Sequence, residues 1–223
     1  MELDTYTELI RQLPYKDQAF STKGSIWKPY VEYKSFGRFY QEAFSKKESI
    51  IISRGELFSI AKKDPQKGIF TTILWGYPMG YTRGFNMSTL FPLFLGQVEF
   101  LSERLSTQKS ITNDELKHML GRCDGIGLST LSKLLYFFNT KINGYRCLIM
   151  DARIIRVLNN AQFTELCSFS SITEQNGKHH YADYLKTCTQ LSKKYGYKPD
   201  QLELFLFMFG NNLKNSCRGK QSA

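Results

Sequence analysis

Residues 112–160 are the most informative stretch of the sequence: TNDELKHMLGRCDGIGLSTLSKLLYFFNTKINGYRCLIMDARIIRVLNN. Within it, residues 121–130 place Gly125 and Gly127 between a helix rich in Leu and Lys and a second helix with an apolar face. Glycines permit positive φ angles and let the backbone approach another group closely. The free N–H groups that open the second helix favour an anion. The pattern predicts a helical hairpin over about residues 112–139 that can clamp a phosphate, although many ordinary helix turns contain the same glycine pair.

Asp151 stands at the end of an apolar run, residues 147–150, directly before an amphipathic helix. Aspartate is a common N-cap residue, so capping alone explains its presence. Its separation from Gly127 is close to the span of one helix and a return. We therefore also expect the Asp151 carboxylate to face whatever the hairpin holds.

Apolar spacing predicts an all-α fold, because helical periodicity runs through nearly the whole chain. Pro65, Pro199 and Ser49 stand at plausible helix starts. We expect one domain of two helical lobes over residues 1–210, followed by a tail, residues 211–223, that frays. The expected helices are 2–12, 26–44, 53–63, 65–75, 86–106, 112–121, 129–139, 152–160, 180–195 and 199–209, with a short extended piece at 146–150.

Two aromatic segments are candidates for a base pocket or a wedge. The loop at residues 75–84, WGYPMGYTRG, carries Trp75, Tyr77 and Tyr81 among glycines and a proline that prevent a helix. Such aromatics stack on bases or cover a core, and the sequence leaves both roles open. Phe205 and Phe209 lie in a nearly all-apolar segment, for which a buried helix is the alternative to a pocket.

The charge balance points to a polyanionic partner. Thirty basic residues face twenty acidic ones, a net charge of +10, and the excess is spread over both halves of the chain. A folded basic surface favours nucleic acid, although solubility is an alternative explanation. Arg122 and Arg153 are the arginines nearest the hairpin and Asp151, and we expect them, with Arg83 and Arg156, to contact phosphates.

Several classes of protein are disfavoured. The apolar runs are far shorter than the roughly 20 residues of a membrane span, and the N-terminal residues do not resemble a signal peptide. We therefore expect a cytoplasmic protein without a membrane partner. The five cysteines form no C-x2-C pair, and the three histidines add no ligand pattern. We expect no metal, no cofactor, no disulfide framework and no obligate protein partner.

The hairpin with its GIG turn, the helix ending in SKLLYFF and the segment LIMDARIIRVL resemble the helix-hairpin-helix DNA glycosylase superfamily. The most similar branch is the bacterial 8-oxoguanine-glycosylase-like one. The resemblance covers about residues 115–160, and residues 73–80 and 199–210 are also similar. It implies an all-α fold of two lobes with a cleft between them, and a monomer. It also implies an enzyme that flips a nucleotide out of double-stranded DNA and hydrolyses its N-glycosidic bond.

The resemblance assigns roles residue by residue. It implies that Gly125, Gly127 and Ser129 grip a DNA phosphate, and that Asp151 is the catalytic carboxylate that stabilises the cation-like sugar. Bifunctional members carry a lysine where this chain has Ser129, and a hydroxyl cannot form a Schiff base. The resemblance therefore implies a monofunctional glycosylase. Lys133 lies one helical turn further on and is the alternative lyase nucleophile; a phosphate contact or a surface position also explains it.

Two questions of function stay open at this point. The substrate is damaged DNA, as in base-excision repair, or a modified base in phage DNA, as in antiviral defence. The alternative from another class is a non-catalytic helix-hairpin-helix module that binds DNA, in which Asp151 is a cap and nothing more.

Overall fold

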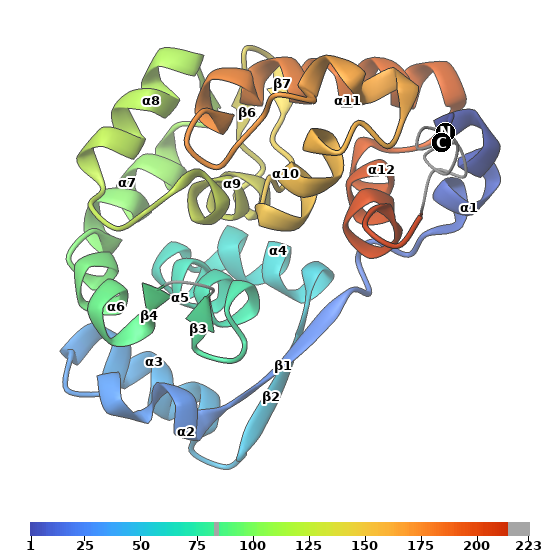
Figure 1. The fold of residues 1–223 in the computed structure, drawn as a ribbon. Helices are drawn as coiled ribbons and strands as arrows, with labels where there is room; N and C mark the ends of the chain where they lie inside the picture. Colours follow the sequence, from blue (N-terminus) through green and yellow to red (C-terminus); the bar gives the residue numbers. More distant parts are fainter. Residues whose placement is uncertain (83–84, 214–223) are drawn as a thin grey trace, which may run out of the picture. The chain divides into compact units, whose positions relative to one another are not determined.

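The computed structural model describes residues 1–82 and 85–213 (Figure 1). The described chain is mostly helical with a few short strands, which confirms the predicted fold class. It divides into two compact units. Unit 2 is continuous and comprises Lys16–Cys147, whereas unit 1 combines Met1–Tyr15 with the chain from Leu148 onward. The predicted hairpin therefore belongs to unit 2 and Asp151 to unit 1.

Unit 2 is built on a central helix, α5 (Pro65–Gly76), whose residues 68–75 are all buried. A helix that is apolar on every side belongs in a core. It packs against α4, α7 and α9, and Gly68 lets α4 come close, because a Cβ there would lie 2.5 Å from the Ala61 Cα. The other elements of unit 2 are β1 (Ala19–Lys23), α2 (Gly24–Trp27), a 3-10 turn (Lys28–Tyr30), α3 (Lys34–Phe44), β2 (Ser49–Ser53), α4 (Arg54–Lys63), β3 (Tyr81–Thr82), β4 (Phe85–Asn86), α6 (Met87–Leu95), α7 (Val98–Thr107), β5 (Ser110–Ile111), α8 (Asn113–Arg122), α9 (Leu128–Phe137), β6 (Lys141–Ile142) and β7 (Tyr145–Arg146).

Unit 1 packs its N-terminal segment against its C-terminal helices. The Tyr6 and Phe163 rings both contact Phe205, which is fully buried. Gly210 lets the last turn approach Val157, because a Cβ at Gly210 would meet that side chain at 2.6 Å. The elements of unit 1 are a 3-10 turn (Leu3–Tyr6), α1 (Thr7–Gln12), α10 (Ala152–Asn159), a 3-10 helix (Thr164–Phe169), α11 (Gly177–Tyr195), α12 (Pro199–Phe205) and a π turn (Leu206–Gly210).

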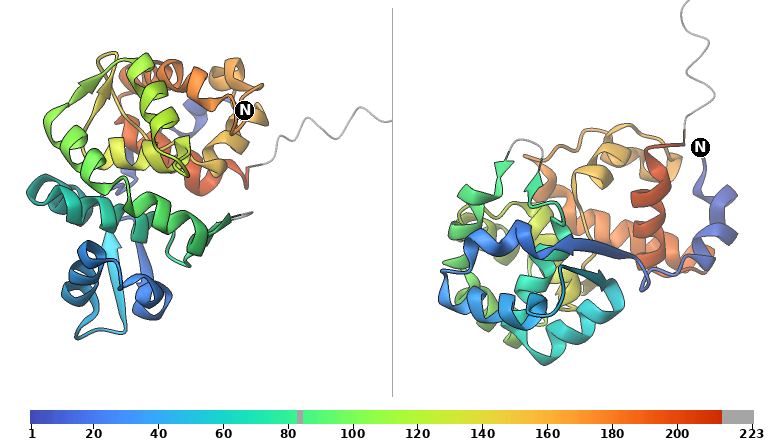
Figure 2. Two further views of the ribbon diagram at one scale, coloured as in Figure 1. Left: turned by 90° about the vertical axis from the view of Figure 1, so that its left-hand side faces the viewer. Right: turned by 90° about the horizontal axis from the view of Figure 1, so that it is seen from below.

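Apart from the extended piece at 146–150, the sequence pattern predicts no strand. β1 and β2 form an antiparallel ribbon in which Ser21 pairs with Ile51, and Figure 2 shows this ribbon from two further sides. Ser49 accordingly begins a strand and not a helix, and Ser53 caps α4 instead. In the predicted extended piece at 146–150, only Arg146 lies in a strand, and residues 147–150 are buried without regular structure.

Two predicted helices are interrupted. The helix predicted over 26–44 is broken before α3 begins. Within α3, a Cβ at Gly37 would lie 2.4 Å from the Val31 carbonyl oxygen. The segment 86–106 divides into α6 and α7 at Gly96. Glycine carries a cost of about 1 kcal/mol in a helix interior, which favours a break at that position.

Candidate active site

The predicted helical hairpin is formed by α8 and α9. A capping box begins α8: the Thr112 hydroxyl accepts from the Glu115 N–H and the Glu115 carboxylate accepts from the Thr112 N–H. The turn closes where the Ile126 N–H donates to the Cys123 carbonyl at 3.0 Å. Gly125 has a φ of +76°, in the left-handed region that favours glycine. The first glycine of the pair is therefore required by the turn itself.

Gly127 occupies a different environment. It is the N-cap of α9, with a φ of −82° that any residue can adopt. A Cβ at this position would meet no atom within 4 Å. No side chain caps α9 at Gly127, and the first helical bonds run from Thr130 and Leu131 to the Gly127 carbonyl. The N–H groups of Leu128 and Ser129 thus open the helix ahead of its first hydrogen bond, as an anion site requires.

Lys133 is buried behind this helix start, with only 5% of its surface exposed. Its Nζ donates to the Ser129 hydroxyl oxygen at 2.9 Å and to the Ser129 carbonyl at 3.1 Å. The ammonium also lies 5.4 Å from the centre of the Tyr77 ring. A surface position, one of the alternatives that the sequence left open for Lys133, is therefore wrong.

The glycine-rich loop reaches the hairpin through Tyr77. Its hydroxyl hydrogen-bonds the Thr130 hydroxyl at 2.5 Å. Trp75 is only 3% exposed and packs on Phe20 and Phe137, which favours its core role over a stacking surface. The Tyr81 backbone lies in β3, but its side chain, like Arg83, lies outside the described residues.

Arg122 lies at the exposed end of α8. Its guanidinium stacks over the Phe100 ring at 4.0 Å, and this contact holds the cation beside the hairpin turn. The sequence did not identify two further residues beside Tyr77 and Lys133. These are Thr130, whose hydroxyl belongs to the GIGLST segment, and Gly76.

In unit 1, Asp151 is the N-cap of α10. Its Oδ1 accepts from the N–H groups of Arg153 at 2.9 Å and Ile154 at 3.1 Å. No hydrogen bond from another described residue reaches Oδ2, and the side chain is half-buried. Asp151 thus combines capping with a second carboxylate oxygen that is available for chemistry. That the carboxylate faces the hairpin stays a prediction, as does a cleft between the two lobes.

The remaining predicted residues of unit 1 are two arginines of α10, Arg153 and Arg156, which are both exposed, and two aromatics. Arg153 is exposed, with its guanidinium 4.9 Å from the centre of the Phe207 ring. Phe205 is fully buried, as the buried-helix alternative expects. Phe209 is half-buried and packs on Phe205, with ring centres 5.7 Å apart.

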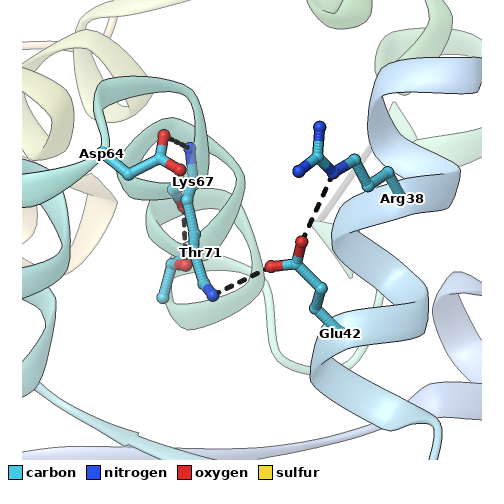
Figure 3. Close-up of polar contacts among 5 residues, drawn as sticks. All are labelled: Arg38, Glu42, Asp64, Lys67 and Thr71. Atoms are coloured by element: carbon cyan, nitrogen blue, oxygen red, sulfur yellow. Dashed lines mark hydrogen bonds and ion pairs between the residues drawn. The ribbon is translucent and has the colours of Figure 1, made fainter.

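The described residues of unit 2 enclose a small cavity and a larger groove. A small cavity of about 30 Å³ touches Tyr77, Gly125 and Thr130, and it has room for one water molecule but not for a base. A larger groove of about 610 Å³ lies among α3, β2, α4 and α5 and contains none of the predicted site residues. Lys67 and Thr71 line this groove, and Figure 3 shows Lys67 paired at 3.1 Å with Glu42, which also pairs with Arg38 at 3.5 Å. In the same view, Asp64 and Thr71 bond the Lys67 backbone.

The His, Cys, Asp and Glu residues in the described part of the chain form no cluster that could hold a metal ion. Burial raises the pKa of the Cys123 and Cys188 thiols, which makes both poor nucleophiles. Among residues 1–82 and 85–213, no helix is long and apolar enough to cross a membrane.

Comparison with known proteins gives one match. The model of a family described as "Putative 8-oxoguanine DNA glycosylase OGG-like protein" matches residues 14–207 of this chain. No curated protein and no solved structure matches the chain.

Proposed function

This chain belongs to the family of 8-oxoguanine DNA glycosylase OGG-like proteins, and on that basis we propose that it is a monofunctional DNA glycosylase. The match confirms the resemblance that the 115–160 segment indicated. In the proposed reaction a damaged or modified base leaves duplex DNA, water adds to the sugar C1′, and an abasic site remains. The bond that breaks joins C1′ to the base nitrogen, and the departing base takes up a proton.

The observation that carries this proposal is that only one of the two Asp151 carboxylate oxygens takes part in capping. Oδ1 holds the start of α10 through two backbone N–H groups, so the side chain is fixed. Oδ2 keeps its lone pairs for other partners. A fixed carboxylate stabilises positive charge that develops on the sugar as the base departs, and it can also accept a proton from the attacking water.

The monofunctional assignment is supported by Ser129 and Lys133. Ser129 offers no amine for a Schiff base. Lys133 directs two of its N–H groups at the Ser129 oxygens, and attack on C1′ would need a free nitrogen lone pair. Lyase chemistry through Lys133 would therefore require the ammonium to lose a proton and the buried side chain to reach the sugar C1′.

The test is a base-release assay on genomic DNA that is normal, oxidised, alkylated or phage-derived with modified cytosines. Released bases are identified by mass spectrometry, and strand breaks are scored with and without alkali. We expect one class of base to be released, with breaks only after alkali. Breaks without alkali, together with a borohydride-trapped adduct, would establish a lyase instead. Salt-sensitive binding without release from any DNA would favour the non-catalytic module.

Asp151→Asn separates catalysis from capping. Asparagine caps a helix as well as aspartate does, so we expect the thermal midpoint to stay unchanged. Without the carboxylate charge, base release should fall by about 100-fold or more. Asp64→Asn is the matched control, because Asp64 caps α5 in the same way through the Lys67 N–H. Wild-type release by the Asp151 variant would contradict the assignment.

A further inference from the structure

We infer that the outer edge of β2 pairs with the same edge of a second copy of this chain, antiparallel and about a two-fold axis at Ile51. The surface concerned is separate from the hairpin and from Asp151. It consists of β2, whose sequence is SIIIS, and the groove beside it (Figure 1). The inference concerns association only and does not depend on the proposed reaction.

The register of the ribbon determines which backbone groups of β2 face outward. Just beyond its two ends, the Gly24 N–H donates to the Glu48 carbonyl at 2.8 Å and the Arg54 N–H donates to the Gln18 carbonyl at 2.9 Å. Both bonds continue the register in which β1 pairs with β2. Bonded and non-bonded residues alternate along an antiparallel strand. The even-numbered residues of β2 therefore bond β1, and its odd-numbered residues direct their N–H and C=O groups away from β1.

The odd-numbered residues of β2 are Ser49, Ile51 and Ser53. The outward direction is visible at Ser53, whose N–H donates to the Glu56 carboxylate of the α4 capping box at 2.8 Å. The N–H and carbonyl groups of Ile51 have no hydrogen-bond partner in the described part of the chain, and its side chain is 72% exposed. A strand edge with open backbone groups and an exposed apolar side chain is a template for pairing with another chain.

The features that usually prevent such pairing are absent from β2. Natural edge strands are commonly protected by lysine, proline, a bulge or a covering segment. The five residues of β2 include no charged residue and no proline, and they pair with β1 one for one, without a bulge. The groove of about 610 Å³ runs along Ile50, Ile51 and Ile52, so the described residues leave space beside the strand.

The symmetry of the strand identifies the partner as a second copy. The sequence SIIIS reads the same in both directions. An antiparallel pair centred on Ile51 therefore sets isoleucine against isoleucine and serine against serine. The pairs are Ile51 with Ile51, Ile50 with Ile52 and Ser49 with Ser53. A two-fold interface requires such self-complementarity, because the same patch serves both copies.

The charges at the ends of β2 favour the antiparallel direction. Lys46, Lys47 and Glu48 precede the strand and are all exposed, so this end is basic overall. At the other end Arg54 is buried, and the exposed charge is that of Glu56. An antiparallel pair sets the basic end of one copy beside the acidic end of the other, where opposite charges attract. A parallel pair would set like charges together.

Cysteine cross-linking tests the register. Opposite residues of a hydrogen-bonded antiparallel pair have Cα atoms about 5.5 Å apart, within the roughly 4.4–6.8 Å that a disulfide spans. Ile51→Cys should therefore form a covalent dimer under mild oxidation, detected on a non-reducing gel.

Ser49→Cys is the matched control for cross-linking. Ser49 is exposed and lies on the same strand and the same face as Ile51. In the proposed register, however, the two copies of Ser49 are separated by about 14 Å. This variant should cross-link no more than the wild-type chain, whose own cysteines set the background.

The association itself is measured on the wild-type chain by analytical ultracentrifugation from about 1 to 100 μM, the range in which a small interface dissociates. We expect an equilibrium of monomer and dimer. Ile51→Lys should raise the dissociation constant by about tenfold or more, because a lysine opposes edge pairing. Leu9→Lys adds the same charge at another exposed apolar position and should leave the equilibrium unchanged.

Three results would overturn the inference. A wild-type chain that stays monomeric over this range would confirm the monomer that the family resemblance implies, and would leave the edge to an extended segment of another protein. Equal cross-linking of the Ser49 and Ile51 variants would show that contacts do not follow the register. A dimer that survives Ile51→Lys would assign the association to another surface.

Folding of the variants is checked by thermal unfolding, and the exposure of Ile51 predicts wild-type midpoints. Should Ile51→Lys fail to fold, the wild-type sedimentation and the two cysteine variants still decide. Base release enters none of these measurements, so a failure of the dimer is distinguishable from a failure of the proposed reaction.

Discussion

The two glycines of the GIG turn differ in backbone conformation and in the space around them. Gly125 has a positive φ and stands close to Leu90, which a Cβ would meet at 3.3 Å. Gly127 has an ordinary φ and open space around it. The fold therefore requires Gly125, whereas in this structure only a ligand that approaches the backbone would require Gly127.

This difference predicts two separable phenotypes. Gly125→Ala should lower the free energy of unfolding by about 1–2 kcal/mol, because alanine is strained at this φ. Gly127→Ala should cost less stability, because the poorer N-cap is offset by the lower conformational entropy of the unfolded chain, yet it should weaken duplex binding because the new methyl group stands where the proposed phosphate would approach. Denaturant unfolding and anisotropy measure the two effects. Equal stability losses in the two variants would refute the distinction.

The sequence identified Ser129 and Lys133 of the hairpin as candidates but not how they are arranged. The spacing of Ser129 and Lys133 placed both side chains on one helix face, and the structure confirms this. The burial of Lys133 could not be predicted, because it depends on Gly76 and Tyr77 from a segment more than 50 residues earlier. Trp75 and Phe205 were ambiguous for the same reason, since burial is decided by partners distant in sequence.

At the scale of elements, helices with strong end signals were predicted well. Pro65 begins α5 and Pro199 begins α12, as expected. Because β2 contains three consecutive isoleucines, its sequence does not show the alternation of exposed and buried side chains. In the structure, Ile51 is 72% exposed and Ile52 is buried. The hairpin of β6 and β7 has a turn signal in its sequence: Asn143 and Gly144, both with positive φ, form its turn.

The capping boxes predict a pH dependence of stability. A backbone hydrogen bond from Ser53 lowers the pKa of Glu56, and one from Thr112 lowers the pKa of Glu115. Carboxyls with a lowered pKa stabilise the fold above their ordinary range near 4.5, and this contribution is lost as the pH falls through the lowered folded-state values. The free energy of unfolding should therefore fall between about pH 5 and pH 3.

Glu56→Gln combined with Glu115→Gln should reduce this fall, because glutamine keeps the capping geometry but does not titrate. Urea unfolding at several pH values measures it. Glu174→Gln, at an exposed position, is the control and should leave the pH profile unchanged. An unaltered profile in the double variant would show that other groups control the acid response.

At the scale of the whole molecule, the positive charge is unevenly divided. Unit 2 has 19 basic and 11 acidic residues, whereas unit 1 has 11 and 9. The hairpin lies in the strongly basic unit and Asp151 in the nearly balanced one. Charges counted for the two halves of the sequence do not show this imbalance, because unit 1 takes residues from both ends of the chain.

The asymmetry predicts that unit 2 supplies most of the contacts to DNA phosphates. Two lysine pairs occupy equivalent places in the last turns of helices, Lys62 and Lys63 in α4 and Lys193 and Lys194 in α11. Changing the first pair to glutamine should reduce the salt slope of duplex binding more than changing the second pair. Anisotropy between about 50 and 200 mM NaCl measures it. A larger effect from the α11 pair would refute the assignment.

The discontinuity of unit 1 also has a consequence for synthesis on the ribosome. The Met1 amino group donates to the Gln162 carbonyl, and the Thr164 N–H donates to the Met1 carbonyl. The first fifteen residues therefore emerge well before their partners, and roughly ten seconds of translation separate the two. Unit 2 is complete during that interval and can fold first. The unit that carries Asp151 closes last, so during synthesis the hairpin can form before the proposed catalytic carboxylate is in place.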